Sequence, residues 1–206
     1  MSSETETGAE AHNADKTKMK NVLIISGHTD LSESVANRTI LETLEQRLPK
    51  AEIVQLDTLY PDFRINVQTE QQRLLKADII VLQFPIFWYS APSLLERWME
   101  ETFQHGFSHG STGDKLFGKK LILSFTTGAP AEMYSHDGPM GYTIDEFLPA
   151  YKAVCKLCRM EFVGYVYTGG VSYSARTTPE LINGQKITAT EHAERLIALL
   201  EKANKM

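Results

Sequence analysis

Short apolar runs alternate along this chain with segments of helical periodicity, and no other feature of the sequence constrains the fold as strongly. Five such runs, rich in β-branched residues, span Asn21–Ser26, Ala51–Leu56, Ala77–Phe84, Lys119–Thr126 and Glu161–Thr168. Runs of about four to eight apolar residues are typical of strands buried on both faces. Between them, apolar residues recur at helical spacing, which predicts helices over 32–48, 67–76, 91–103, 142–157 and 189–203.

Strands that alternate with helices predict βαβ crossovers, and hence a parallel sheet with helices on both faces. The five strands favour a flavodoxin-like α/β fold, a three-layer α/β/α sandwich whose five-stranded parallel sheet has the order 2-1-3-4-5. The 206 residues suit one such domain. We expect it to span residues 19–206, after a disordered, polar N-terminal tail over residues 1–18.

Charge and hydropathy argue against several classes of protein. The formal net charge is -5 and the pI is near 5.7, whereas a nucleic-acid-binding protein usually carries a basic face. The longest apolar stretch, residues 77–92, is interrupted by Asp78, Gln83 and Pro85, and it is shorter than the ~20 residues that a membrane-spanning helix needs. No apolar signal-peptide core precedes the first strand. We therefore expect a cytoplasmic protein.

The two cysteines, Cys155 and Cys158, form a CxxC pair near the end of a predicted helix. A redox-active pair usually lies at a helix N-terminus, where the helix dipole stabilises the thiolate. At a helix C-terminus the dipole opposes the thiolate, which favours a structural interpretation of both cysteines. No second Cys or His pair has the spacing of a zinc site, so we expect no metal.

Ligands of such folds bind at the carboxyl ends of the strands, near the point where the strand order reverses. The loop over residues 26–37, after the first strand, leads into a helix and contains hydroxyls and His28. Hydroxyls and free N–H groups at a helix N-terminus suit a phosphate, although plain helix capping by Ser32 or Ser34 explains the same residues. The loop has neither the GxGxxG nor the GxxxxGK[ST] pattern, which argues against a dinucleotide fingerprint and a P-loop.

Two further loops at the same edge have an unusual composition. Residues 84–92 place three adjacent aromatic residues between two prolines, and they suit either a flat ring ligand or the covering of a core or subunit interface. Residues 126–135 combine two threonines with Gly128, which permits close backbone approach to a polar ligand. Tyr134, in the same loop, could donate a hydrogen bond to a developing oxyanion. Three such loops at one edge point to a binding site.

In these loops the sequence resembles the flavodoxin-like NAD(P)H:quinone reductases. The resemblance covers about Lys20 to Tyr173 and rests on an SGH…SxAN loop, on FPIFWYSAP followed by LLERW, on GFSHGSTGDKLFGK and on TTGAPAEMYS. It is greatest to the short bacterial FMN branch, which includes the ancillary oxidoreductases of glutathione-regulated potassium-efflux systems.

The resemblance implies a set of flavin-binding residues. The flavin phosphate and ribityl chain would contact His28, Ser34, Val35, Ala36 and Asn37. The isoalloxazine would lie against Pro85, Ile86, Phe87, Trp88 and Tyr89, and its pyrimidine edge against Thr126, Thr127, Gly128 and Ala129. Tyr134 matches a catalytic tyrosine of the family, whereas Met140 stands where the larger relatives have a histidine.

The function that the resemblance implies is a flavin-dependent NAD(P)H:quinone oxidoreductase. A ping-pong reaction would pass hydride from NADH or NADPH through flavin N5 to a quinone. FMN is favoured over FAD because the long C-terminal extension of the larger relatives is missing, and the family implies a homodimer. The alternative is a regulatory flavoprotein subunit of a membrane potassium-efflux transporter. An electron-transfer flavodoxin is disfavoured, because the first loop lacks the T-x-T-G-x-T pattern. For Arg176 two interpretations stay open, a cover for the sheet and a contact for a nicotinamide phosphate.

Overall fold

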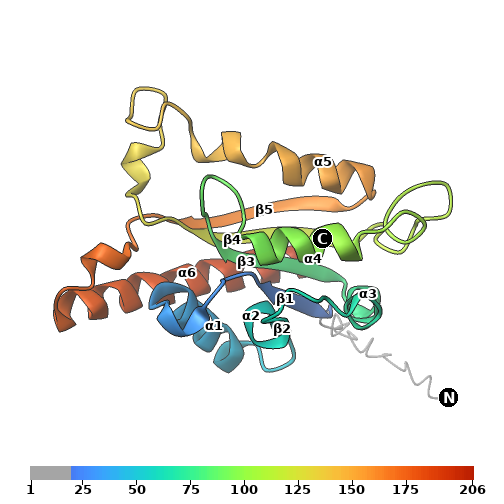
Figure 1. Cartoon of the computed structure of the whole chain (residues 1–206), viewed down its shortest axis with the longest axis horizontal. Coiled ribbons are helices and arrows are strands. Elements are labelled where there is room, and N and C mark those ends of the chain that lie inside the picture. Colours follow the sequence, from blue (N-terminus) through green and yellow to red (C-terminus); the bar gives the residue numbers. More distant parts are fainter. Residues whose placement is uncertain (1–19) are drawn as a thin grey trace, which may run out of the picture.

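The structure, a computed structural model, describes residues 20–206 and shows three layers with a sheet in the middle (Figure 1). Within that range the sheet has five parallel strands in the order β2-β1-β3-β4-β5, which confirms the predicted flavodoxin-like topology. The strands are β1 (Val22–Ser26), β2 (Glu52–Gln55), β3 (Ile79–Pro85), β4 (Lys120–Thr126) and β5 (Glu161–Thr168). The tail predicted over residues 1–18 lies outside the described residues.

Helices cover both faces of the sheet (Figure 1). One face is covered by α1 (Ala36–Arg47) and α6 (Pro179–Lys205), and the other by α2 (Leu56–Leu59), α3 (Val67–Lys76), α4 (Ser93–Thr102) and α5 (Pro149–Leu157). Four short 3-10 turns lie in the described loops, η1 (Leu31–Glu33), η2 (Ala131–Met133), η3 (Ile144–Phe147) and η4 (Tyr173–Ala175). None of the helices within residues 20–206 is both long enough and apolar enough to cross a membrane.

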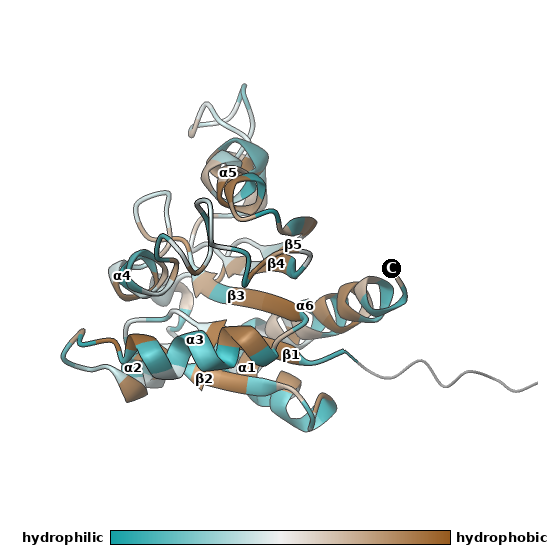
Figure 2. Ribbon diagram, turned by 90° about the vertical axis from the view of Figure 1, so that its right-hand side faces the viewer, coloured by the Kyte–Doolittle hydropathy of each residue, from teal (hydrophilic) through white to brown (hydrophobic). Residues whose placement is uncertain are grey.

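The two helical layers explain why the central strands are apolar throughout. Successive residues of a strand point to opposite faces, so Ile79 and Val81 join the core under α1 and α6, while Ile80 and Leu82 join the core under α3, α4 and α5. Every residue of β3 and β4 is buried. Figure 2 shows these central strands as hydrophobic ribbon between helices of mixed character. The edge strand β2 is short and partly exposed, as expected for a strand that pairs on one side only.

Three of the predicted helices begin at least four residues away from their predicted start, whereas α3 and α4 lie within two residues of theirs. The helix predicted over 32–48 begins at Ala36, because the Asp30 side chain caps the separate turn η1 before it. The helix predicted over 142–157 is divided into η3 and α5, and α5 begins at Pro149, which is suited to a first helical turn. The helix predicted over 189–203 already begins at Pro179, where the Thr178 side chain accepts the Leu181 N–H.

The CxxC pair has the structural role that the sequence favours. Cys155 lies in the last turn of α5 and Cys158 caps its end; both are buried free thiols. Burial raises the pKa of Cys155 to about 12 and also raises the pKa of Cys158. Thiols in this state are poor nucleophiles at neutral pH.

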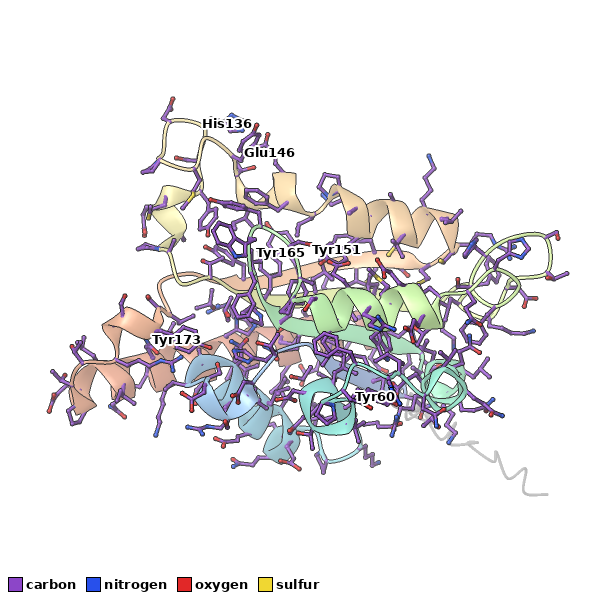
Figure 3. The ribbon with its side chains drawn as sticks, viewed as in Figure 1. Tyr60, His136, Glu146, Tyr151, Tyr165 and Tyr173 are labelled. Carbon is purple, nitrogen blue, oxygen red and sulfur yellow. The ribbon has the colours of Figure 1, made fainter. Side chains whose placement is uncertain are left out.

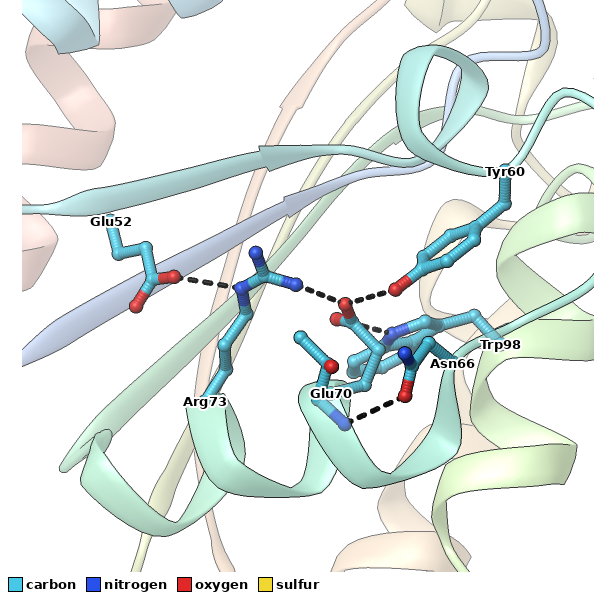
Figure 4. Close-up of polar contacts among 7 residues, drawn as sticks. Glu52, Tyr60, Asn66, Glu70, Arg73 and Trp98 are labelled. Carbon is cyan, nitrogen blue, oxygen red and sulfur yellow. Dashed lines mark hydrogen bonds and ion pairs between the residues drawn. The ribbon is translucent and has the colours of Figure 1, made fainter.

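A buried carboxylate on α3 connects this helix to α4 and to the end of α2 (Figure 4). Glu70 of α3 is fully buried and accepts hydrogen bonds from Tyr60 Oη at 2.6 Å and Trp98 Nε1 at 2.9 Å. It also pairs with Arg73, whose Nε donates to Glu52 of β2 at 2.8 Å. A buried charge is tolerated when it is paired and fully hydrogen-bonded in this way. Since Trp98 belongs to α4, this cluster fixes the helix that follows the aromatic loop.

Candidate functional site

A cavity of about 180 Å³ lies at the carboxyl ends of β1, β3, β4 and β5. Many of the predicted flavin-binding residues line it, from all three loops singled out by the sequence. The lining consists of His28, Ser34, Asn37, Pro85, Ile86, Phe87, Thr126, Gly128, Val171, Ser172, Tyr173 and Arg176. The cavity thus brings together residues that follow four adjacent strands of the sheet, β1, β3, β4 and β5.

Other predicted site residues lie beside this cavity rather than in its wall. Val35 and Ala36 are buried at the start of α1, and Thr127 and Ala129 flank Gly128 in the loop after β4. Trp88 is 93% exposed, so it does not pack against the cavity. The expected contact of Trp88 with a ring ligand stays a prediction.

The first loop presents the N-terminus of α1 to the cavity. Ser34 is buried and its Oγ accepts the Asn37 N–H at 3.1 Å and the Asn37 Nδ2–H at 3.2 Å. Ser34 thus accepts a hydrogen bond from the first turn of α1, although the N-cap position itself is held by Val35 and not, as the capping interpretation expected, by Ser32 or Ser34. Because Ser34 Oγ acts as an acceptor in both bonds, its own hydroxyl hydrogen is left for another partner. The amides of the first helical turn also lack intrahelical acceptors, which makes this end of α1 suited to an anion.

The Asn37 side chain links this helix to the two central strands. Its Nδ2 donates to Thr126 Oγ1 of β4 at 3.2 Å, and its Oδ1 accepts from Gln83 Nε2 of β3 at 2.7 Å. All three side chains are buried. Hydrogen bonds in such a low-dielectric place are costly to break, so they hold the N-terminus of α1 against the ends of β3 and β4.

His28 supplies a neutral hydrogen-bond donor to the cavity. The side chain is buried, and its Nδ1 accepts the Asp30 N–H at 3.1 Å. Burial lowers the pKa of His28, so the ring is neutral near pH 7 and carries its proton on Nε2. This Nε2 lies 3.1 Å from the hydroxyl of Tyr173, across the cavity. The ring also meets Phe87 edge-on, with centroids 5.9 Å apart.

The aromatic loop after β3 forms a tight, strained turn. Phe87 and Ser90 exchange backbone hydrogen bonds of 3.0 and 3.1 Å, with Trp88 and Tyr89 at the two central positions. Their φ angles are 50° and 67°, in the left-handed region that glycine or asparagine usually fills in such turns. Backbone strain of this kind costs about 1–3 kcal/mol per residue and is concentrated at functional sites. The turn directs Trp88 into solvent, while the Tyr89 ring stacks on Phe147 at 5.4 Å.

The loop after β4 is held from two sides. Thr127 Oγ1 donates to the Ala129 carbonyl at 2.8 Å, and therefore accepts the hydroxyl hydrogen of Tyr167, which is also 2.8 Å away. The backbone of Thr127 exchanges hydrogen bonds with Thr168 and Val171 of the neighbouring segment. The short turn around Gly128 is consequently fixed before any ligand arrives.

Tyr134 lies next to this loop, at the end of η2. Its ring meets Tyr167 and Phe147 edge-on, with centroids 6.2 and 6.1 Å apart. The Tyr89 hydroxyl lies 3.5 Å from Sδ of Met140. His136 is exposed and its Nε2 lies 2.8 Å from Glu146, away from Tyr173 and the cavity (Figure 3). The Met140 thioether has no proton to donate, and the His136 ring is hydrogen-bonded to Glu146.

A larger groove, of about 630 Å³, lies between α1 and the edge strand β2. Its lining includes four carboxylates, Asp30, Glu42, Glu45 and Asp57, and one cation, Arg38. This excess of negative charge disfavours a phosphate there. By contrast, the lining described for the smaller cavity includes Arg176 and no carboxylate. Electrostatics thus favours the smaller cavity as the anion site.

Sequence reasoning missed one wall of the cavity. Val171, Ser172 and Tyr173 come from the segment between β5 and α6, and Arg176 lies beside them. Arg176 therefore belongs to the cavity that Ser34 and His28 line. The signal was available, because the carboxyl end of a fifth parallel strand reaches the same edge of the sheet as the other four.

Comparison with known proteins decides the family. A model of the flavodoxin-like fold family matches residues 20–193, which is most of the chain. An uncharacterised NAD(P)H oxidoreductase of Bacillus subtilis, YrkL, is 37% identical over 141 residues, covering 68% of this chain and 80% of that protein. The chain belongs to the flavodoxin-like NAD(P)H quinone oxidoreductase family. This assignment confirms the resemblance on which the predicted site rests and places the protein among oxidoreductases.

Two further members of this family are informative. The glutathione-regulated potassium-efflux system ancillary protein KefG of Pectobacterium atrosepticum is 34% identical over 164 residues, covering 80% of this chain and 87% of that protein. General stress protein 14 of Treponema denticola, solved in complex with FMN, matches with a TM-score of 0.78 and 28% identity. The match covers 87% of this chain and 99% of that one.

In the present chain, a buried histidine, His192, lies between α6 and the sheet. His192 is fully buried, with Nε2 2.8 Å from Ser124 Oγ of β4 and Nδ1 2.8 Å from Thr168 Oγ1 of β5. Burial, aided by the charge of Arg195, lowers the pKa of His192 to about 3. The neutral ring thus joins the ends of β4 and β5 to α6.

Acid should weaken this link. The unfolded chain binds a proton at His192 below about pH 6.5, whereas the folded chain binds it only near pH 3. The stability that the neutral ring contributes is therefore present above pH 6.5 and is lost progressively as the pH falls from 6.5 to 3. Urea denaturation between pH 7 and 4 should show a shallower loss for His192→Gln than for the wild type. His105→Gln, at an exposed site, is the control; equal slopes for all three proteins would contradict the assignment.

Proposed function

We propose that the protein is an FMN-dependent NAD(P)H:quinone oxidoreductase. The observation that carries the proposal is the pairing of a buried cavity rich in neutral and cationic donors with an exposed aromatic turn at its rim. FMN has a matching division, with a phosphate and ribityl chain at one end and a flat ring at the other. The solved FMN complex of the Treponema denticola relative supports the choice of cofactor.

The donors at the cavity suit a phosphate. The hydroxyl hydrogen of Ser34 and the N-terminal amides of α1 other than that of Asn37 are available to an anion. The Nε2–H of neutral His28 faces the Tyr173 hydroxyl, which is a weaker acceptor than a phosphate oxygen. A neutral histidine can donate to an anion without first gaining a proton. The residues present therefore fit a flavin phosphate, with Asn37 holding Ser34 and the start of α1 in place.

Two backbone segments would hold the ring. Pro85, Ile86 and Phe87 form one wall, and Thr126 and Gly128 form another, each fixed by its strand. Bound FMN supplies the hydride acceptor for NAD(P)H and then the hydride donor for the quinone, so both substrates use one face in turn. The turn at Trp88 and Tyr89 leaves aromatic surface exposed beside that face. Flat substrates would stack there and exclude water.

Tyr134 would complete the reduction of the acceptor. A quinone that receives hydride needs one proton to become a hydroquinone, and an oxygen that gains negative charge is stabilised by a positioned hydroxyl donor. Met140 has no proton to give, and the ring of His136 is engaged by Glu146. Tyr134 is thus the group near the loop after β4 that would polarise or protonate the acceptor oxygen.

The exposed aromatic rim also suits a second copy of the chain. Trp88 and Tyr142 are exposed, and large exposed aromatics are typical of an interface. We include a homodimer in the proposal for this reason.

The KefG relative supports a second candidate function, a regulatory flavoprotein on a potassium-efflux transporter at the cytoplasmic side of a membrane. The two functions are compatible, because a docked subunit can retain its turnover.

Steady-state kinetics tests the proposed activity. The purified protein supplied with FMN should oxidise NADH or NADPH only slowly alone, and much faster when menadione is added. Double-reciprocal plots of the initial rate against NAD(P)H concentration, taken at several fixed menadione concentrations, should give parallel lines if the reaction is ping-pong. A protein that binds FMN and yet transfers no electrons from either nicotinamide would contradict the enzymatic function and favour the regulatory one.

Removing the Tyr134 hydroxyl separates chemistry from cofactor binding. We expect Tyr134→Phe to lower kcat with menadione by about 100-fold, the usual contribution of a positioned acid, while FMN affinity stays near the wild-type value. Tyr142→Phe, which removes an exposed hydroxyl nearby, is the control and should keep full turnover. If Tyr134→Phe weakened FMN binding as much as it slowed turnover, the proposed role of Tyr134 would be wrong.

A further inference from the structure

The segment over residues 169–178, between β5 and α6, closes one side of the cavity and is firmly held. Its backbone receives support from the loop after β4, since the Gly170 N–H donates to the Ala129 carbonyl and the Val171 N–H to the Thr127 carbonyl. Gln185 of α6 donates to the Ser172 carbonyl at 2.8 Å. The 3-10 turn η4 follows, and Tyr173 and Arg176 at its two ends line the cavity.

Two side chains of this segment reach the loop after β1. The Tyr173 hydroxyl lies 3.1 Å from Nε2 of His28, and Nη1 of Arg176 donates to the Glu33 carbonyl. The Arg176 guanidinium lies over the Tyr173 ring, with Cζ 4.0 Å from the ring centroid. Together these contacts form a bridge from the β5–α6 segment to the N-terminal side of α1. Figure 3 shows Tyr173 in this position, beside the start of α6.

The bridge leaves one strong donor unused. Nε of Arg176 is buried and has no hydrogen-bond partner among residues 20–206, although it belongs to a residue of the cavity wall. No carboxylate of the described residues forms an ion pair with Arg176. A buried N–H of a charged group without an acceptor is costly, which indicates that an anion completes the site. Guanidinium groups bind phosphate oxygens with two donors at once.

The position of the bridge also sets what kind of phosphate fits. The bridge joins the β5–α6 segment to the loop after β1 beside a cavity that His28, Ser34 and Arg176 all line. A terminal phosphate monoester can end behind it, whereas the pyrophosphate and adenosine of FAD would have to continue past Tyr173 and Arg176. Since Glu33 and His28 tie the bridge down at two points, that passage requires both contacts to break.

We propose that Arg176 binds the terminal phosphate of FMN and that the bridge of Arg176 and Tyr173 selects FMN over FAD. This proposal rests on the proposed flavin-dependent function and names how the same site chooses its cofactor. Tyr173 is a positioning residue, because its ring packs against the guanidinium and holds it beside the cavity. A lysine at this position would retain the charge without the planar fork, so it would replace Arg176 only in part.

Titration with three flavins tests the proposal without any enzyme assay. Protein stripped of flavin is titrated with FMN, riboflavin and FAD while flavin fluorescence is followed. Riboflavin has the same ring and ribityl chain without a phosphate. We expect Arg176→Gln to weaken FMN binding by about 10- to 100-fold, to leave riboflavin binding within about 2-fold of wild type, and to narrow the preference for FMN over FAD. Arg176→Lys should recover part of the FMN affinity.

The control removes a different cation near the same helix. Arg38 lies on α1, pairs with Glu42 and does not line the cavity, so Arg38→Gln should leave all three affinities unchanged. Equal weakening of FMN and riboflavin in Arg176→Gln would overturn the phosphate contact and leave a structural role. An unchanged ratio of FMN to FAD affinity would overturn the selectivity. A wild-type protein that binds none of the three flavins would overturn the flavin-dependent function itself, and this proposal with it.

Discussion

The buried amide of Asn37 joins helix α1 to strands β3 and β4, and the geometry of the cavity depends on this link. In a parallel sheet the carboxyl ends of all strands lie at one edge, independently of the side chains. The sheet alone, however, does not fix the direction in which the N-terminus of a helix points. The hydrogen bonds that Asn37 donates to Ser34 and Thr126 and accepts from Gln83 supply that constraint. They align the donors of the first loop with the wall formed by the other two.

The two ends of the site are built differently. The end near Ser34 and His28 is buried, polar and hydrogen-bonded, as a place that holds one cofactor tightly should be. The end near Trp88 and Tyr89 is exposed, aromatic and strained in its backbone. A deep, fixed phosphate end and an open ring end allow a cofactor to stay while different flat substrates exchange. On this account the choice of cofactor and the choice of substrate are made by different residues.

Local pattern was sufficient wherever local contacts decide the structure. β3 and β4 could be predicted from their apolar runs because both of their faces are buried, and α3 because Asn66 caps a clear amphipathic repeat. The early start of α6 was missed because its first half is largely exposed and lacks an apolar face. The bridge of Arg176 and Tyr173 was beyond reach for another reason: its partners, Glu33 and His28, are brought to it only by the complete sheet. The exposure of Trp88 likewise depends on a backbone conformation that its residue type disfavours.

The measurement that tests this account most directly is the identity of the flavin carried by the purified protein. A visible absorption spectrum shows whether oxidised flavin is present, and chromatography after heat release shows which flavin it is. The account predicts a yellow protein that releases FMN at close to one molecule per chain, or a colourless one that takes up FMN to that level. Release of FAD would contradict the assignment of the phosphate end, and failure to bind either flavin would contradict the account as a whole.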